Sequence, residues 1–120
     1  MSRNVIKDKS FAFAIRIVKL SQYLTDTKRE YFLSKQLLKS GTSVGAMVRE
    51  AEHAETKADF KHKMAIAQKE INETIYWLEL LNKTQFLTEQ EFVSMNTDAV
   101  EIIKLLTSIL KSVKNNNDHG

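Results

Sequence analysis

The chain has 120 residues and a formal net charge of +3, with no cysteine and no proline. This length suits one domain with a real hydrophobic core. The lack of cysteine excludes a disulfide framework and thiolate chemistry. The same lack of cysteine fits a reducing cytoplasm, where we expect the protein. No stretch approaches the roughly 20 apolar residues that cross a membrane, so we expect no membrane partner.

The first predicted helix begins between Asn4 and Ser10 and ends near Leu24. Apolar residues at helical spacing form its core-facing stripe: Phe13, Ile17, Leu20 and Leu24. An adjacent stripe holds Phe11, Ile15 and Val18. The basic amino end resembles a targeting signal, but Arg16 and Lys19 interrupt the apolar run and no small-residue cleavage site follows. We therefore favour an amphipathic helix over a processed leader.

The second predicted helix runs from Thr27 to about His53. Thr27 and Glu30 have the spacing of a capping box, in which hydroxyl and carboxylate each accept a backbone N–H. Its core seam is Leu33, Leu37, Ser40, Val44, Met47 and Ala51. Gly41 and Gly45 lie inside the helix, where each costs up to ~1 kcal/mol relative to alanine. The unbroken periodicity favours a continuous helix with a close neighbour; a hinge is the alternative.

The third predicted helix starts at a cap formed by Thr56 and Asp59 and reaches about Asn82 or Lys83. Its apolar residues step by four and three with almost no phase error, which places one side of the helix against its neighbours. The members of this seam are Phe60, Met64, Ala67, Ile71, Thr74, Leu78 and Leu81.

The fourth predicted helix starts at a capping box of Thr88 and Glu91 and ends near Lys114. Its seam is Phe92, Met95, Ala99, Ile102, Leu106, Ile109 and Val113. All connections are short, and short links between long helices make antiparallel neighbours. We therefore expect an all-α fold, an antiparallel up-down-up-down four-helix bundle over residues 1–114, with a polar disordered tail over 115–120.

The helices carry more apolar surface than one bundle core needs. On the second helix the surplus forms a stripe of Leu38, Gly41, Gly45 and Val48. We expect this stripe to be an oligomer interface, because extended apolar patches rarely stay wet. A wide arc facing the core of a single chain is the alternative.

Two residue pairs have the spacing of metal ligands in helical bundles: Glu50 with His53, and Asp59 with His62. The histidines fall off the core seams, and the first and fourth helices supply no matching inward carboxylates. No nucleophile–base set and no phosphate-binding glycine loop are visible. We therefore expect no enzyme, no metal and no cofactor.

The charges are unevenly placed along the chain. Residues 1–50 hold ten Lys/Arg against four Asp/Glu, while the remainder holds eight against eleven. A basic ridge of this kind is typical of phosphate contacts, and its expected members are Arg16, Lys19, Lys28, Lys35, Lys39 and Arg49. An ordinary solvated face is the alternative. No aromatic platform interleaves the expected ridge, so base-specific readout is not predicted.

Much of the chain resembles the 23S rRNA intervening-sequence proteins. These share a Ser/Gly-rich stretch leading into an Arg-Glu-Ala end of the second helix, a Ser/Thr-x-x-Asp/Glu-Phe start of the third, and a long helix rich in Ala and Glu. The matches are Ser43, Val44, Gly45, Arg49, Glu50, Ala51, Thr56, Asp59, Phe60, Ala67, Glu70 and Glu73. Met47 and His53 depart from the family pattern, where asparagine and glycine are usual.

The resemblance implies a four-helix bundle that assembles into a ring, a homopentamer, of obscure role. The avidity proteins of diversity-generating retroelements are similar in fold and bind nucleic acid through a basic ring surface; that parallel is one of fold alone. Our leading hypothesis is an oligomer that binds RNA or DNA electrostatically. The alternative is a protein-interaction scaffold, such as a polymerase accessory subunit, with no nucleic-acid binding of its own.

Overall fold

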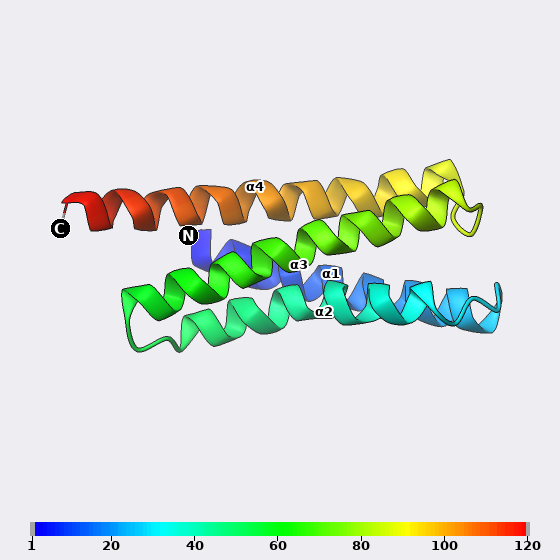
Figure 1. Ribbon diagram of the computed structural model, residues 1–120, viewed down its shortest axis with the longest axis horizontal. Coiled ribbons are helices and arrows are strands. Elements are labelled where there is room, and N and C mark those ends of the chain that lie inside the picture. The colour runs from blue at the N-terminus through cyan, green and yellow to red at the C-terminus, as the bar shows by residue number, and fades with distance from the viewer. Residues whose placement is uncertain (1, 120) are drawn as a thin grey trace.

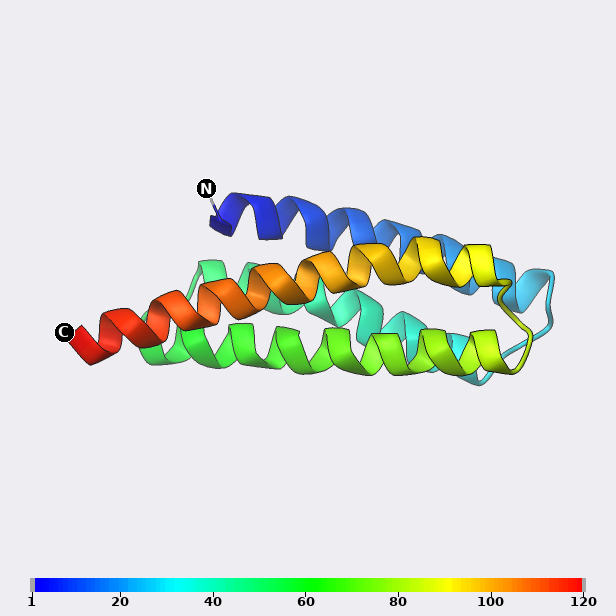
Figure 2. The same cartoon turned by 90° about the horizontal axis from the view of Figure 1, so that it is seen from above.

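The structure, a computed structural model, describes the backbone of residues 2–119 and the side chains of residues 5–114. It contains four helices: α1 (Ser2–Asp26), α2 (Leu33–Glu52), α3 (Lys57–Lys83) and α4 (Glu89–His119). Each helix packs on the next, and α1 contacts α4 to close the bundle, which measures 52 × 22 × 20 Å (Figures 1 and 2). The predicted antiparallel up-down-up-down four-helix bundle is confirmed.

The core is built from the periodic seams predicted for the helices. Every member of the α3 seam is buried, and so are the central members of the α4 seam. In α1 the stripe with Phe13, Ile17 and Leu24 is buried, whereas Phe11, Ile15 and Val18 remain exposed. The inward side of each helix was therefore predicted correctly. None of the helices in the described part of the chain is long and apolar enough to cross a membrane.

Small residues let α1 and α2 pack closely. A Cβ placed on Gly41 would lie within 2.9 Å of three side-chain atoms of Ile17, and one placed on Gly45 would lie 3.3 Å from the backbone oxygen of Ser10. Further along, the Ser21 hydroxyl donates to the Ser34 carbonyl oxygen across 3.3 Å. The prediction of a continuous helix with a close neighbour is confirmed, and that neighbour is α1.

The predicted starts of α3 and α4 are correct. The Asp59 N–H donates to Thr56 Oγ1 at 3.0 Å. At α4 the capping box is complete: the Thr88 N–H donates to Glu91 Oε1 at 2.8 Å, and the Glu91 N–H donates to Thr88 Oγ1 at 3.1 Å. Both patterns have the residue spacing that this reciprocal bonding needs.

The predicted start of α2 at Thr27 is wrong. The Thr27 N–H instead donates to the Tyr23 carbonyl oxygen and completes the last turn of α1. Arg29 then adopts a left-handed backbone (φ 58°), and the helix begins at Leu33. The Glu30 carboxylate caps α2 from outside by accepting the N–H groups of residues 32, 33 and 34. Glu30 therefore satisfies backbone donors of the helix it precedes and does not reach back to Thr27.

The outer ends of the chain extend further in helix than predicted. α1 begins at Ser2, ahead of the expected range, and α4 continues to His119, past the expected end at Lys114. In both views α4 passes beyond the α2–α3 turn (Figures 1 and 2). The side chains of residues 115–120 lie outside the described part of the chain, so the expected disorder of this tail stays a prediction.

Candidate nucleic-acid interface

The predicted basic residues separate into several environments. Arg16 points from α1 to α4, where its guanidinium makes a 2.6 Å ion pair with Asp98. The same group donates to the side chain and the backbone oxygen of Ser94. Arg16 therefore joins α1 to α4, and its positive charge is paired with the Asp98 carboxylate.

Two more basic residues of α1 are also engaged within the chain. Lys7 pairs with Glu52 of α2 at 3.3 Å, and Lys9 pairs with Glu101 of α4 at 3.3 Å. These partners come from the acidic part of the sequence, so folding neutralises part of the positive excess of residues 1–50.

The other cations described within residues 5–50 form no ion pair with a described carboxylate. They are Lys19, Lys28, Arg29, Lys35, Lys39 and Arg49. Most lie in or near the turn that joins α1 to α2, at the end of the bundle that also holds the α3–α4 turn (Figures 1 and 2). We call the four nearest this turn, Lys28, Arg29, Lys35 and Lys39, the basic end.

The predicted ridge on the second helix is only partly formed, because Lys28 lies in the turn before α2. Its ammonium group sits 5.9 Å from the ring centroid of Tyr23. Lys35 is exposed in the first turn of α2, and exposed Lys39 follows one turn later. Burial raises the pKa of Glu70 on α3, and the charge of Lys39 opposes that rise, so Lys39 lies on the α3 side of α2.

Arg49 lies at the other end of α2, away from the basic end. Its guanidinium carbon is 4.9 Å from the ring centroid of Phe11, a cation–π contact. Both residues line a shallow groove of about 230 Å³ between α1 and α2. Arg49 is therefore placed against α1 and does not continue the Lys35–Lys39 surface.

Lys19 lines a separate groove of about 460 Å³ between α1 and α4, together with Arg16, Tyr23 and residues of the first turns of α4. Tyr23 links this groove to Lys28 through the contact described above.

Sequence reasoning missed the aromatic residues of the α1–α2 turn. Tyr31 is 52% exposed and Phe32 is 81% exposed, and they lie in the sequence between Arg29 and Lys35. The expectation that no aromatic platform interleaves the ridge did not consider these two exposed rings, and it stays a prediction. The helix start predicted at Thr27 places both residues inside a helix, whereas they lie in the turn before it. The adjacent Tyr-Phe pair was the signal that could have found them.

The predicted interface stripe on α2 is largely covered by the same chain. Gly41 and Val48 are buried, and Gly45 lies against the backbone of Ser10 in α1. Leu38 is the member left exposed. The wide core-facing arc accounts for the other three, so an interface with another subunit would need residues outside this stripe.

The two pairs with metal-ligand spacing lie at the α2–α3 end. Glu50 pairs with Lys63 at 3.1 Å, and its hydrogen bond raises the pKa of the Lys63 ammonium. Among the described residues, no group of three His, Asp or Glu side chains is placed to hold a metal ion.

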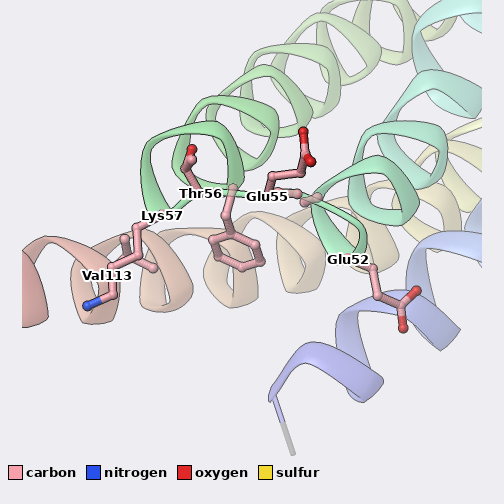
Figure 3. Close-up of a pocket in the computed structure, with 8 residues that line it drawn as sticks. Glu52, Glu55, Thr56, Lys57 and Val113 are labelled. Atoms are coloured by element: carbon pink, nitrogen blue, oxygen red, sulfur yellow. The ribbon is translucent and has the colours of Figure 1, made fainter.

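A hollow of about 280 Å³ also opens at this end, between the α2–α3 turn and α4. Its walls include the apolar side chains of Phe60 and Val113, and its rim carries Glu52, Glu55 and Lys57 (Figure 3). Figure 3 shows Glu52 reaching toward α1, where Lys7 binds it. The hollow is the space left where α4 passes the turn.

The 23S rRNA-intervening sequence protein family matches residues 2–108 of the chain. The chain belongs to this family. A crystal structure of a protein of unknown function from the S23 ribosomal protein family of Bacteroides thetaiotaomicron has the same fold, with a TM-score of 0.92. The two sequences are 54% identical, and the match covers 92% of this chain and 99% of the other. No curated protein matches the chain. The resemblance seen in the sequence is confirmed. The two matches identify the family and the fold of the chain, and neither states an activity.

Proposed function

We propose that the protein is a non-enzymatic assembly of identical subunits that binds RNA or DNA through its phosphate backbone. The observation that carries the proposal is the basic end: four cations that form no ion pair with a described carboxylate lie in the α1–α2 turn and in the first two turns of α2. Lys7, Lys9 and Arg16 of α1 are instead paired with carboxylates of α2 and α4, so within residues 5–50 most of the cations that form no such pair lie at this end.

Phosphate binding through such a surface is electrostatic and independent of sequence. Each phosphate neutralised releases counterions, so affinity falls steeply as salt rises. Within the predicted set, Lys19, Lys28, Lys35 and Lys39 are the residues available for this role, and Arg29 joins them. Arg16 would have to leave Asp98 to contribute.

Charge reversal tests the proposal. We expect Lys35→Glu with Lys39→Glu to weaken binding to structured RNA and to duplex DNA alike, at least tenfold at low salt, and to flatten the dependence on salt. The matched control is Lys57→Glu with Lys61→Glu, an exposed pair of the same spacing at the opposite end of the bundle. Equal affinity in both double variants, measured by fluorescence anisotropy across a salt series, would contradict the assignment.

Assembly is the second part of the proposal. Phe11, Ile15 and Val18 of α1 are exposed on one side of that helix, as is Leu38 of α2. The contacts between Gly41 and Ile17 and between Ser34 and Ser21 place Leu38 level with Val18 along the two helices. We call these four residues the outer α1–α2 face. We propose that a second copy of the chain covers it in a ring, the homopentamer that the family resemblance implies.

A protein-interaction scaffold is the second candidate function, and the apolar outer α1–α2 face favours it. In that case a different protein covers the face, and its capture by the purified chain does not weaken with salt. Such a scaffold would show negligible nucleic-acid binding in the charge-reversal experiment.

A metal-dependent enzyme would instead retain stoichiometric iron or manganese through purification from metal-replete cells. We propose that this chain retains neither metal.

A further inference from the structure

The α1–α2 turn exposes two aromatic side chains on an ordered backbone. Phe32 is 81% exposed, the highest value among the large apolar side chains described as exposed, and Tyr31 is 52% exposed. The turn is hydrogen-bonded to the end of α1: the Lys28 N–H donates to the Tyr23 carbonyl oxygen, and the Glu30 N–H donates to the Leu24 carbonyl oxygen. The rings are therefore presented by a fixed segment of chain.

The Glu30 side chain fixes the end of the turn that leads into α2. Its side chain is only 7% exposed, and its two oxygens accept the N–H groups of Phe32, Leu33 and Ser34 at 3.2, 3.0 and 2.7 Å. Bonds from backbone N–H groups to an ionised carboxylate are among the stronger hydrogen bonds in proteins. The carboxylate thus faces the helix start, and its charge is taken up by backbone donors.

Local packing does not explain the exposed rings. A hydrophobic staple would pair Tyr31, which precedes the cap position, with the residue at position 36. That residue is Gln36, which is polar and exposed. Phe32 occupies the cap position, where a small polar side chain is preferred. Neither aromatic residue is needed to start α2, which Glu30 already caps.

The surroundings of the rings are basic. Lys28 and Arg29 precede Tyr31 and Phe32 in the turn, and Lys35 follows in the first turn of α2. Asp26 is the exposed acidic residue of this segment, because Glu30 is buried in its cap. A cationic surface interleaved with aromatic rings matches a chain of phosphates carrying accessible bases.

We propose that the α1–α2 turn is a stacking platform for unpaired bases, so that the protein prefers single-stranded RNA or DNA over duplexes. One or two bases stack on Phe32 and Tyr31, while Lys28, Arg29 and Lys35 contact the flanking phosphates. Stacking tolerates any sequence, because every base has a π-face. This inference rests on the proposed phosphate binding, and it adds stacking contacts with the bases to the contacts with the phosphates. Positive charge around the rings favours a nucleic acid over an apolar protein groove as the occupant.

The test compares two probes of equal length: a single-stranded oligothymidylate and an abasic oligonucleotide, which has the phosphates but no bases. We expect the wild-type protein to bind the first more tightly. Phe32→Ala should lose about 5- to 150-fold for oligothymidylate, the range for one stacked base, and should be unchanged for the abasic strand. Phe32→Leu should behave like alanine, because it keeps an apolar side chain without a π-face, and Phe32→Trp should restore binding.

The control variant is Tyr76→Ala, which removes a ring of similar exposure, 55%, from α3. Binding of both probes with equal affinity by wild type and Phe32→Ala would overturn the stacking platform while leaving phosphate binding intact. Binding of neither probe would overturn both proposals. Retained affinity in Phe32→Leu, or a change of oligomer mass in Phe32→Ala, would also overturn the platform, because the ring would then serve an apolar contact between proteins.

Discussion

At the scale of single residues, Glu30 sets where α2 begins. Three backbone N–H groups converge on one buried carboxylate, and the Ser34 hydroxyl adds a bond to the Glu30 carbonyl oxygen at 2.8 Å. Phe32 at the cap position has no side-chain oxygen to accept these N–H groups, so the Glu30 carboxylate accepts them instead. The start of α2 therefore depends on this one side chain.

We expect Glu30→Gln to lower the free energy of unfolding by about 1–3 kcal/mol, because a neutral amide has one acceptor oxygen and leaves buried donors poorly matched. Urea unfolding followed by circular dichroism measures the change. Glu55→Gln, at an exposed position in the α2–α3 turn, is the control and should stay within about 0.5 kcal/mol of the parent. Equal stability of the two variants would show that the cap is dispensable.

Sequence reasoning succeeded at the caps of α3 and α4 and failed at Thr27 for a physical reason. The pattern of a threonine followed three residues later by an acid permits reciprocal bonding, but it does not prevent the acid from serving donors further along the chain. At Glu91 the carboxylate reaches back to Thr88; at Glu30 it reaches forward. The error placed Arg29, Tyr31 and Phe32, the residues on which the stacking proposal depends, inside a helix.

At the scale of helices, the two glycines of α2 have unequal surroundings. A methyl group on Gly41 would meet the side chain of Ile17, which is fully buried and has little room to move. A methyl group on Gly45 would meet a backbone oxygen of Ser10 at 3.3 Å, which a shift of a few tenths of an ångström relieves. The periodicity of the sequence predicted that a helix approaches here, but it could not say which one.

We expect Gly41→Ala to destabilise the bundle by about 1–3 kcal/mol through overpacking, even after the gain in helix propensity of about 1 kcal/mol. Gly45→Ala should lie close to neutral, because the same gain offsets a milder contact. Thermal unfolding of both variants checks the difference. Ile17→Val should recover part of the Gly41→Ala loss, since it removes one of the clashing carbons; a greater loss at Gly45 would contradict this account of the α1–α2 contact.

At the scale of the whole molecule, seam periodicity and short connections were sufficient to predict the architecture, because they determine which side of each helix faces inward and which helices are neighbours. They could not predict how charges meet. Arg16 and Asp98 are 82 positions apart, and Lys9 and Glu101 also join α1 to α4. Only the closed bundle shows that Arg16 of the predicted ridge is paired with Asp98, whereas Lys28 and Lys35 near the α1–α2 turn form no ion pair with a described carboxylate.

The outer α1–α2 face is exposed in the single chain. The proposed assembly depends on a second copy of the chain covering this face. We expect light scattering after size exclusion to give the wild-type protein about five times the 13.8 kDa chain mass. Ile15→Glu should shift it to the monomer, because burying an unpaired carboxylate between subunits is costly, while the folded chain tolerates a charge at this exposed position. Val93→Glu, at a similarly exposed position on α4, should keep the wild-type mass. A monomeric parent would refute the ring, and an Ile15→Glu variant that stays assembled would place the contact elsewhere.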